Sequence, residues 1–242
     1  MQGLEGYSGI SIWKEQLISD MVVVLLLGLL IMFAIVFRSN YRLFDKMVRD
    51  VVHAKDRLSL FEEVGGNETV FRSFMIFQSL FLCSLALFLF SRNQRYIDNY
   101  SGVGANLVVI GALFALLLAY YVFKRIMYAT IGSIFTRPDR YRNWRTGYTA
   151  ATAMWGALLY IPVLWISFIT GYEKAAVIMF VILFAAWRLL IVYKSIRIFN
   201  LKSIGILYIL LYLCAQEILP LFFLYEGLKY LYNFIDELVL WY

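Results

Sequence analysis

The sequence predicts an all-α fold: a polytopic membrane helix bundle of about six transmembrane helices, with amphipathic helices at the membrane surface. Hydrophobic residues make up 62% of the 242 residues, charged residues only 16%, and the mean hydropathy is +0.74. Soluble domains hold about 45–50% apolar and about 25% charged residues, and a soluble fold of this size cannot bury the excess apolar surface. The composition therefore excludes a secreted domain, a disordered chain and a cytosolic enzyme.

The whole chain, residues 1–242, is predicted to form one integral membrane domain. A span needs roughly 20 apolar residues. The stretches that meet this need lie at about residues 21–37, 73–91, 103–123, 148–170, 175–193 and 203–224. Basic residues directly follow the first span, which is typical of a stop-transfer sequence rather than a cleaved signal. In the fourth span, Pro162 predicts a kink, and Thr152 and Gly156 predict close helix packing.

Lys and Arg are distributed unevenly between the two sides of this arrangement. Of the 22 basic residues, 17 lie in or beside the three loops that share one side, and five lie on the other side. Because cytoplasmic loops are rich in Lys and Arg, this asymmetry predicts that both termini lie outside. The three basic loops of this multi-pass chain would then lie in the cytoplasm.

The segments between the spans suggest surface helices. Residues 41–64 combine apolar residues at helical spacing with charges, which predicts a cytoplasmic amphipathic helix packed on the bundle or on headgroups, or used to dock a partner. Residues 126–135 are too apolar for a free loop and too short to cross, which predicts an interfacial or re-entrant helix. Residues 225–242 carry a polar stripe and are expected to form an outer interfacial helix.

A basic and aromatic loop follows residues 126–135. Cations alternate there with Tyr and Trp, a mixture that binds nucleic acid or phosphate in some proteins and anionic lipid headgroups at a bilayer. We expect lipid binding, with no nucleic acid. The basic residues concerned are Arg137, Arg140, Arg142 and Arg145.

Glu217 is the first candidate functional residue, because an ionised acid inside a span is costly unless it is paired, protonated or facing water. Pro220, Cys214 and Arg188 are the other candidates. If the sixth span begins at residue 203, Glu217 lies in the outer half of the bilayer and Arg188 is too far away to be an obvious partner. Glu217 is then either a structural acid bonded to Tyr160 or Gln78, or a functional proton or partner site.

The two cysteines, Cys83 and Cys214, both lie in apolar runs and are expected to be small buried hydrophobic residues. No catalytic, cofactor or metal motif is found, so no catalytic residue, cofactor or metal ligand is assigned.

The last span reads Leu210-Leu211-Tyr212-Leu213-Cys214-Ala215-Gln216-Glu217-Ile218-Leu219-Pro220-Leu221. This motif resembles the closing helix of a family of uncharacterised integral membrane proteins from Bacteroidetes, a domain of unknown function. The resemblance also takes in the first span with its basic flank, the Tyr121/Lys124/Gly132 segment and most of the remaining chain. It implies a bacterial inner-membrane location and carries no activity.

The function that remains after these exclusions is that of a non-catalytic component that associates with other membrane or envelope proteins, or with itself as a homo-oligomer, within membrane lipids. An alternative is a small proton-coupled or lipid transporter that uses Glu217. A second alternative is a membrane enzyme on a lipid-linked substrate, which the lack of paired polar groups disfavours.

Overall fold

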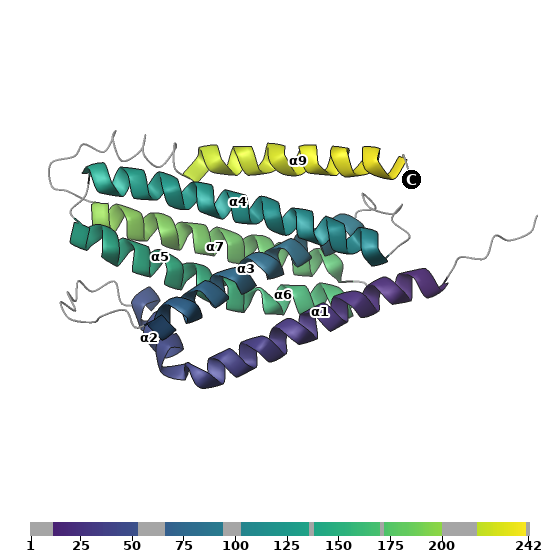
Figure 1. Cartoon of the computed structure of the whole chain (residues 1–242), viewed down its shortest axis with the longest axis horizontal. Helices are drawn as coiled ribbons and strands as arrows, with labels where there is room; N and C mark the ends of the chain where they lie inside the picture. Colours follow the sequence, from purple (N-terminus) through teal and green to yellow (C-terminus); the bar gives the residue numbers. More distant parts are fainter. Residues whose placement is uncertain are drawn as a thin grey trace, which may run out of the picture.

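The computed structural model describes residues 12–52, 66–93, 103–135, 138–169, 172–199 and 217–240, and every regular element in them is a helix. The helices are α1 (Ile12–Ser39), α2 (Tyr41–Val52), α3 (Gly66–Asn93), α4 (Val103–Phe135), α5 (Pro138–Leu158), α6 (Tyr160–Phe168), α7 (Glu173–Phe199) and α9 (Leu219–Leu240). Most of them lie side by side in one bundle, with α1 crossing at one edge and α9 alongside α4 (Figure 1).

Five stretches within these helices are long and apolar enough to cross a membrane. They are Asp20–Ser39, Glu68–Arg92, Val103–Thr130, Trp144–Phe168 and Lys174–Ser195. The predicted all-α bundle of membrane type is therefore confirmed. Most of the predicted sixth span, residues 203–216, lies outside the described residues.

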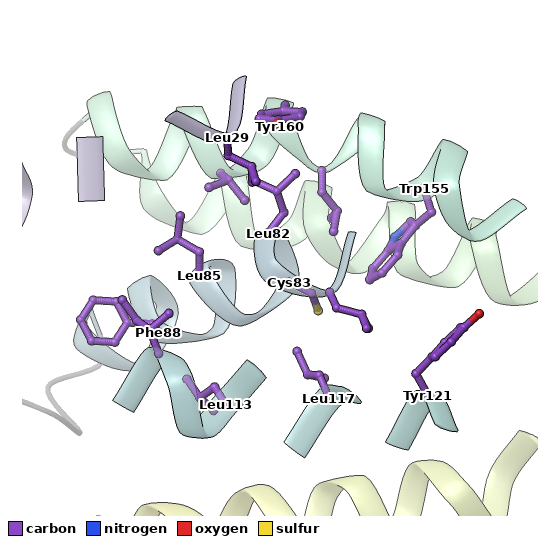
Figure 2. Packing of buried hydrophobic residues seen from close by; sticks show 14 of the residues in the cluster. Leu29, Leu82, Cys83, Leu85, Phe88, Leu113, Leu117, Tyr121, Trp155 and Tyr160 are labelled. Atoms are coloured by element: carbon purple, nitrogen blue, oxygen red, sulfur yellow. The ribbon is translucent and has the colours of Figure 1, made fainter. Parts of the chain in front are cut away.

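The α3 helix carries much of the hydrophobic core. Its Leu85 and Phe88 have no exposed surface, and they belong to one buried cluster with Leu113 and Leu117 of α4 (Figure 2). Cys83 is buried in the same cluster, as a small hydrophobic residue would be. Cys214 lies outside the described residues.

Helices α3 and α5 approach closely where their side chains are small. A Cβ atom added to Gly156 would lie 1.7 Å from Ser79 Oγ and 2.8 Å from Ser79 Cα, so only glycine fits. The Ser79 hydroxyl lies 2.7 Å from the Met75 carbonyl oxygen and 3.1 Å from that of Thr152, so it bonds its own helix and its neighbour. The predicted close packing at Thr152 and Gly156 is confirmed, and its partner is α3.

The fourth predicted span is interrupted between α5 and α6 at Leu159. Pro162 follows by three residues, and its ring has no N–H to give to the carbonyl group four residues earlier, that of Leu158. The chain re-forms helical bonding at once, since Val163 donates to the Leu159 carbonyl. The expected kink is therefore a short break one turn before the proline.

The amphipathic helix expected at residues 41–64 is described from Tyr41 to Val52 as α2. It packs against α5 at one end of the bundle (Figure 1). Met47 is buried there with Phe71, Met75 and Ala153. The apolar face of α2 thus packs on the bundle itself, one of the alternatives that the sequence leaves open.

Residues 126–135 do not form a separate interfacial or re-entrant helix. They continue α4 without a break, so that α4 extends over 33 residues from Val103 to Phe135. The expectation was wrong because it treated Lys124-Arg125 as the end of the membrane helix. No proline lies in this stretch, and both the basic pair and the one glycine, Gly132, are accommodated within the helix.

The α9 helix runs alongside α4 (Figure 1), and three contacts fix its register. Glu217, just before α9, binds Tyr128 of α4. Further along, a Cβ atom added to Gly227 would lie 3.2 Å from Leu116 of α4. The third contact is a hydrogen bond between the hydroxyl groups of Tyr232 and Ser91, which belongs to α3. The boundary between span and interfacial helix predicted at residues 224/225 falls within α9, which is one continuous helix there. Its exposed Glu226, Lys229 and Asn233 lie on the side away from Gly227, which faces Leu116.

Candidate functional site

Three ionisable side chains meet where α4, α7 and the start of α9 come together. The Glu217 Oε2 atom lies 2.7 Å from Lys124 Nζ and 2.7 Å from Arg188 Nη1. The Lys124 side chain has no exposed surface, and the side chains of Glu217 and Arg188 are each 10% exposed. We name these three residues, with Tyr120 and Tyr128, the ion cluster.

Two tyrosines complete the hydrogen bonding of the ion cluster. The Tyr128 hydroxyl donates to Glu217 Oε1, so both carboxylate oxygens are engaged. Arg188 Nη2 donates to the Tyr120 hydroxyl. Since buried charges are tolerated when they are paired and hydrogen-bonded, the tyrosines allow the three charges to stay away from solvent.

Aromatic rings surround the Arg188 guanidinium. Its Cζ atom lies 4.9 Å from the ring centre of Trp187, 5.2 Å from that of Phe184 and 5.8 Å from that of Tyr120. Rings at this distance attract a cation through their negative faces. Among the described residues, Arg188 Nε has no hydrogen-bond partner, so these rings and the two Nη contacts hold the charge.

The ion cluster holds two cations and one anion. The sequence contains no other acid in residues 103–135 or 200–216, and the only acid of α7, Glu173, lies at the opposite end of that helix from Arg188. Glu217 is therefore the counter-charge for both Lys124 and Arg188. Losing it would leave two buried cations without an anion, which is far more costly than losing one of the cations.

The sequence builds this site from a simple spacing on α4. Tyr120, Lys124 and Tyr128 are four residues apart, which places them on one face of the helix. Arg188 comes from α7, and Glu217 lies with Ile218 in a wider, π-type turn just before α9. Turns of this kind are frequent at functional sites. Pro220 is buried in the first turn of α9.

The structure brings Glu217 and Arg188 together, so the prediction that Arg188 is out of reach was wrong. That prediction started the last helix at residue 203 and placed Glu217 far along it. The contacts instead put Glu217 level with Lys124, near the end of the stretch Val103–Thr130. The expected partners Tyr160 and Gln78 are not among the described side chains that bind Glu217, and the Tyr160 hydroxyl and Gln78 Oε1 have no described hydrogen-bond partner.

Sequence reasoning missed Lys124, Tyr120 and Tyr128. Lys124 was counted as the first residue of a cytoplasmic loop. Two features of the sequence identify Lys124 as part of the membrane helix. Residues 126–135 are apolar, so the helix extends beyond the lysine, and the two tyrosines lie four residues before and four residues after it. Among the described residues, no three His, Cys, Asp or Glu side chains gather closely enough to hold a metal ion.

From Pro138 onward, the predicted basic and aromatic loop 137–148 is the first half of α5, and its Trp144 and Tyr148 face the bundle instead of forming a belt at its surface. Trp144 and Tyr148 are buried, and the ring centres of Trp144 and Tyr128 are 4.2 Å apart. Trp144 Nε1 donates to Ser195 Oγ of α7 over 3.1 Å. Arg145 is exposed. Arg137 and the side chains of Arg140 and Arg142 lie outside the described part, so headgroup binding by these arginines stays a prediction.

A second feature is the outward face of α9, which we define as Phe222, Glu226, Lys229 and Asn233. All four are exposed, and none of them contacts another described polar or aromatic group. Gly227, on the opposite side, faces Leu116 near the middle of the stretch Val103–Thr130. Glu226 and Lys229 therefore lie level with the centre of a helix that is apolar enough to cross a membrane.

Residues 22–228 match the protein family described as "Domain of unknown function (DUF4271)". The match covers most of the chain, and it confirms that the chain belongs to an uncharacterised domain family. No curated protein and no solved structure matches the chain.

Proposed function

The chain belongs to the DUF4271 family, and we propose that it is a non-catalytic, multi-pass membrane protein that works in association with another protein of the membrane or envelope. The resemblance of its last motif and the charge asymmetry of its loops support a bacterial inner membrane with both termini outside. The observation that carries the proposal is the outward face of α9.

This face is poorly suited to lipid. At the centre of a bilayer, a Lys or an acidic side chain costs about 2.5–3.5 kcal/mol on insertion scales. Glu226 and Lys229 lie level with Leu116, so neither side chain reaches the headgroups from there. A protein surface that pairs these charges removes the cost. The face is therefore better explained by a protein neighbour than by lipid.

The test is recovery of a neighbour from native membranes. We expect crosslinking in the membrane, followed by affinity purification and mass spectrometry, to give a specific adduct through α9. Replacing Glu226 and Lys229 together with Leu removes the charges that select the partner, so the adduct should be lost while the protein still inserts. Lys174→Leu, at an exposed lysine of α7, is the matched control and should keep it. Recovery of the chain alone as a monomer would contradict the proposal.

A second candidate, proton-linked transport, is favoured by the ion cluster. Acidic side chains buried within membrane helices are typical components of proton-coupled carriers. In vesicles containing the purified protein and a pH-sensitive dye, an imposed pH gradient should drive proton flux. The variant Glu217→Gln keeps the shape of the side chain but cannot ionise, so vesicles that hold an equal amount of folded variant should show no flux. Equal flux in the two proteins, or none above empty vesicles, would exclude this function.

A further inference from the structure

A cavity of about 590 Å³ lies at the elbow between α1 and α2. Figure 1 shows this elbow at one end of the bundle, where α2 turns back toward α5. The cavity is lined by residues 38–43, which form the elbow, and by Glu68 of α3, and we name it the elbow pocket. Ligand sites in proteins have volumes of about 300–1,000 Å³, so the elbow pocket has the size of a binding site.

The elbow is held in shape by Asn40. Its backbone N–H and its side-chain amide both donate to the Val36 carbonyl, over 3.0 and 3.2 Å. Its own carbonyl accepts from the N–H groups of Leu43 and Phe44, over 2.9 and 3.1 Å. The rings of Phe37 and Phe44 meet edge to face, with their centres 5.0 Å apart, and so pack α2 against the end of α1. A pocket with fixed walls binds a ligand at a lower entropic cost.

The charges of the elbow pocket favour an anion. Arg38 and Arg42 are both exposed, and neither forms an ion pair with another residue that the structure describes. The one acid of the lining, Glu68, is already paired, since its Oε1 atom lies 2.6 Å from Arg72 Nη2 and 3.0 Å from Arg72 Nε. Two positive charges therefore remain without a counter-charge. Because arginine binds a phosphate through two parallel N–H donors, a phosphate group suits this lining.

The elbow pocket lies at the depth of the lipid headgroups. The span Asp20–Ser39 ends at it, so that Arg38 occupies the last turn of the span and Arg42 lies just beyond. Tyr41, between the two arginines in the sequence, is 60% exposed, and tyrosine is enriched at the boundary between membrane and water. The phosphates found at this depth are those of phospholipids.

The surface of α1 next to the elbow pocket is suited to acyl chains. Ile31 and Ile35 precede Arg38 by seven and three residues, which places the three side chains on one side of α1. Both isoleucines are exposed. Among the five described spans, this one is buried least by the bundle, at 17%. The same side of α1 thus offers two cations for a headgroup and an apolar surface for the chains below it.

We propose that the elbow pocket binds one acidic phospholipid, with Arg38 and Arg42 holding its phosphate. A zwitterionic lipid would bring its own cation beside the two arginines, and the acid that could receive that cation is paired with Arg72. The site is separate from the headgroup contact predicted for residues 137–148, because it is formed by the elbow between α1 and α2. It requires no contact at α9, so it does not depend on the proposed association.

The test measures lipid binding to the purified full-length protein in mild detergent by native mass spectrometry. Phosphatidylglycerol, which is acidic, and phosphatidylcholine, which is zwitterionic, are added separately with the same acyl chains. We expect one phosphatidylglycerol per chain to bind at least about tenfold more tightly than phosphatidylcholine. Equal affinity for the two lipids would overturn the proposal.

Three variants locate the bound lipid. Arg38→Gln combined with Arg42→Gln should weaken phosphatidylglycerol binding at least about tenfold, because each basic residue near a headgroup contributes about fivefold. Ser39→Trp keeps both arginines but fills the elbow pocket, so it should weaken binding by a similar factor. Lys174→Gln removes an exposed positive charge at the start of α7 and is the matched control that should bind as the wild type does.

The variants also separate a pocket from a general attraction of positive charge. All the replaced side chains are exposed, so each variant should melt within about 2 °C of the wild type. Wild-type binding by the double arginine variant would refute the role of the two arginines. Wild-type binding by Ser39→Trp, or an equal loss in Lys174→Gln, would show that charge alone attracts the lipid and would also overturn the proposal.

Two further measurements distinguish the lipid from other ligands. Inorganic phosphate offers the same group without acyl chains, so displacing the lipid should require at least a tenfold molar excess of it, or about one unit in log concentration. Displacement at equal concentration would assign the elbow pocket to a soluble phosphate instead. In native membranes, a photoreactive amino acid in place of Tyr41 should give an adduct with the mass of a phospholipid. A protein adduct in its place would overturn the proposal.

Discussion

Removing Glu217 should destabilise the bundle far more than removing either of the cations it binds. In Glu217→Leu, Lys124 and Arg188 stay buried with no counter-charge, since both are bound to Glu217 Oε2 at 2.7 Å. Breaking a buried ion pair from one side costs about 3–5 kcal/mol. At about 2–4 °C per kcal/mol for a chain of this length, the melting temperature in detergent should fall by about 6–20 °C.

Lys124→Met should behave differently, although the Lys124 side chain is the most deeply buried of the three. It leaves one cation, Arg188, facing one anion, and methionine fills a similar volume. A cost below about 1 kcal/mol is expected, because hydrophobic replacement of a buried charge is often neutral when no opposite charge is left over. Adding Lys124→Met to Glu217→Leu should therefore recover at least about 1 kcal/mol of the loss.

The assay is thermal unfolding of the purified variants in one detergent, read by tryptophan fluorescence. Asp20→Leu is the control, because it removes an exposed acid and leaves the ion cluster untouched. A Glu217→Leu melting temperature within about 2 °C of wild type would refute the reasoning. So would a loss in Lys124→Met that equals the loss in Glu217→Leu, because the surplus of positive charge would then have no energetic consequence.

Three further predictions follow from the packing and the charge pattern. Gly156→Ala should cost about 1–3 kcal/mol in the same thermal assay, because its Cβ would overlap Ser79, whereas Gly111→Ala, with nothing within 4 Å of the added atom, should be neutral or stabilising. Replacing three loop arginines with Gln should lower retention of anionic lipid during purification, with each basic residue worth about 1 kcal/mol; the residues are Arg140, Arg142 and Arg145. Cysteine labelling in intact cells should reach residues 10 and 235 from outside but not residues 60 and 135; labelling of residue 60 from outside would contradict the proposed orientation.

Much of the fold could be predicted because each cue for it is local. The lengths of the apolar stretches around Val103–Phe123 and Ala175–Tyr193 are enough to predict membrane-spanning helices. Pro162 alone is enough to predict an interruption of its helix. The close approach of α3 and α5 was also foreseen on one side, since Gly156 has no side chain. Its partner Ser79 was not foreseen, because nothing in the local sequence says which neighbouring helix faces a glycine.

The ion cluster could not be predicted in full because it depends on register between distant segments. Lys124 and Glu217 are 93 residues apart, and their meeting requires knowing where α4 ends and where α9 begins. Because the Lys124-Arg125 pair was treated as a membrane boundary, the end of α4 and the depth of Glu217 were both predicted wrongly. The importance of Glu217 was predictable, since an acid in an apolar run needs a partner wherever it lies. The identity of that partner required the three-dimensional structure.

The order of the ion cluster along the chain also bears on how the protein is made. Both cations emerge from the ribosome before the acid that neutralises them: Lys124 precedes Glu217 by 93 residues and Arg188 precedes it by 29. At about 5–20 residues per second, Glu217 is synthesised about 5–20 s after Lys124. A chain stopped at residue 216 keeps both cations and never receives the carboxylate. Such a chain should fold less stably than one that contains Glu217, because its two buried cations have no counter-charge.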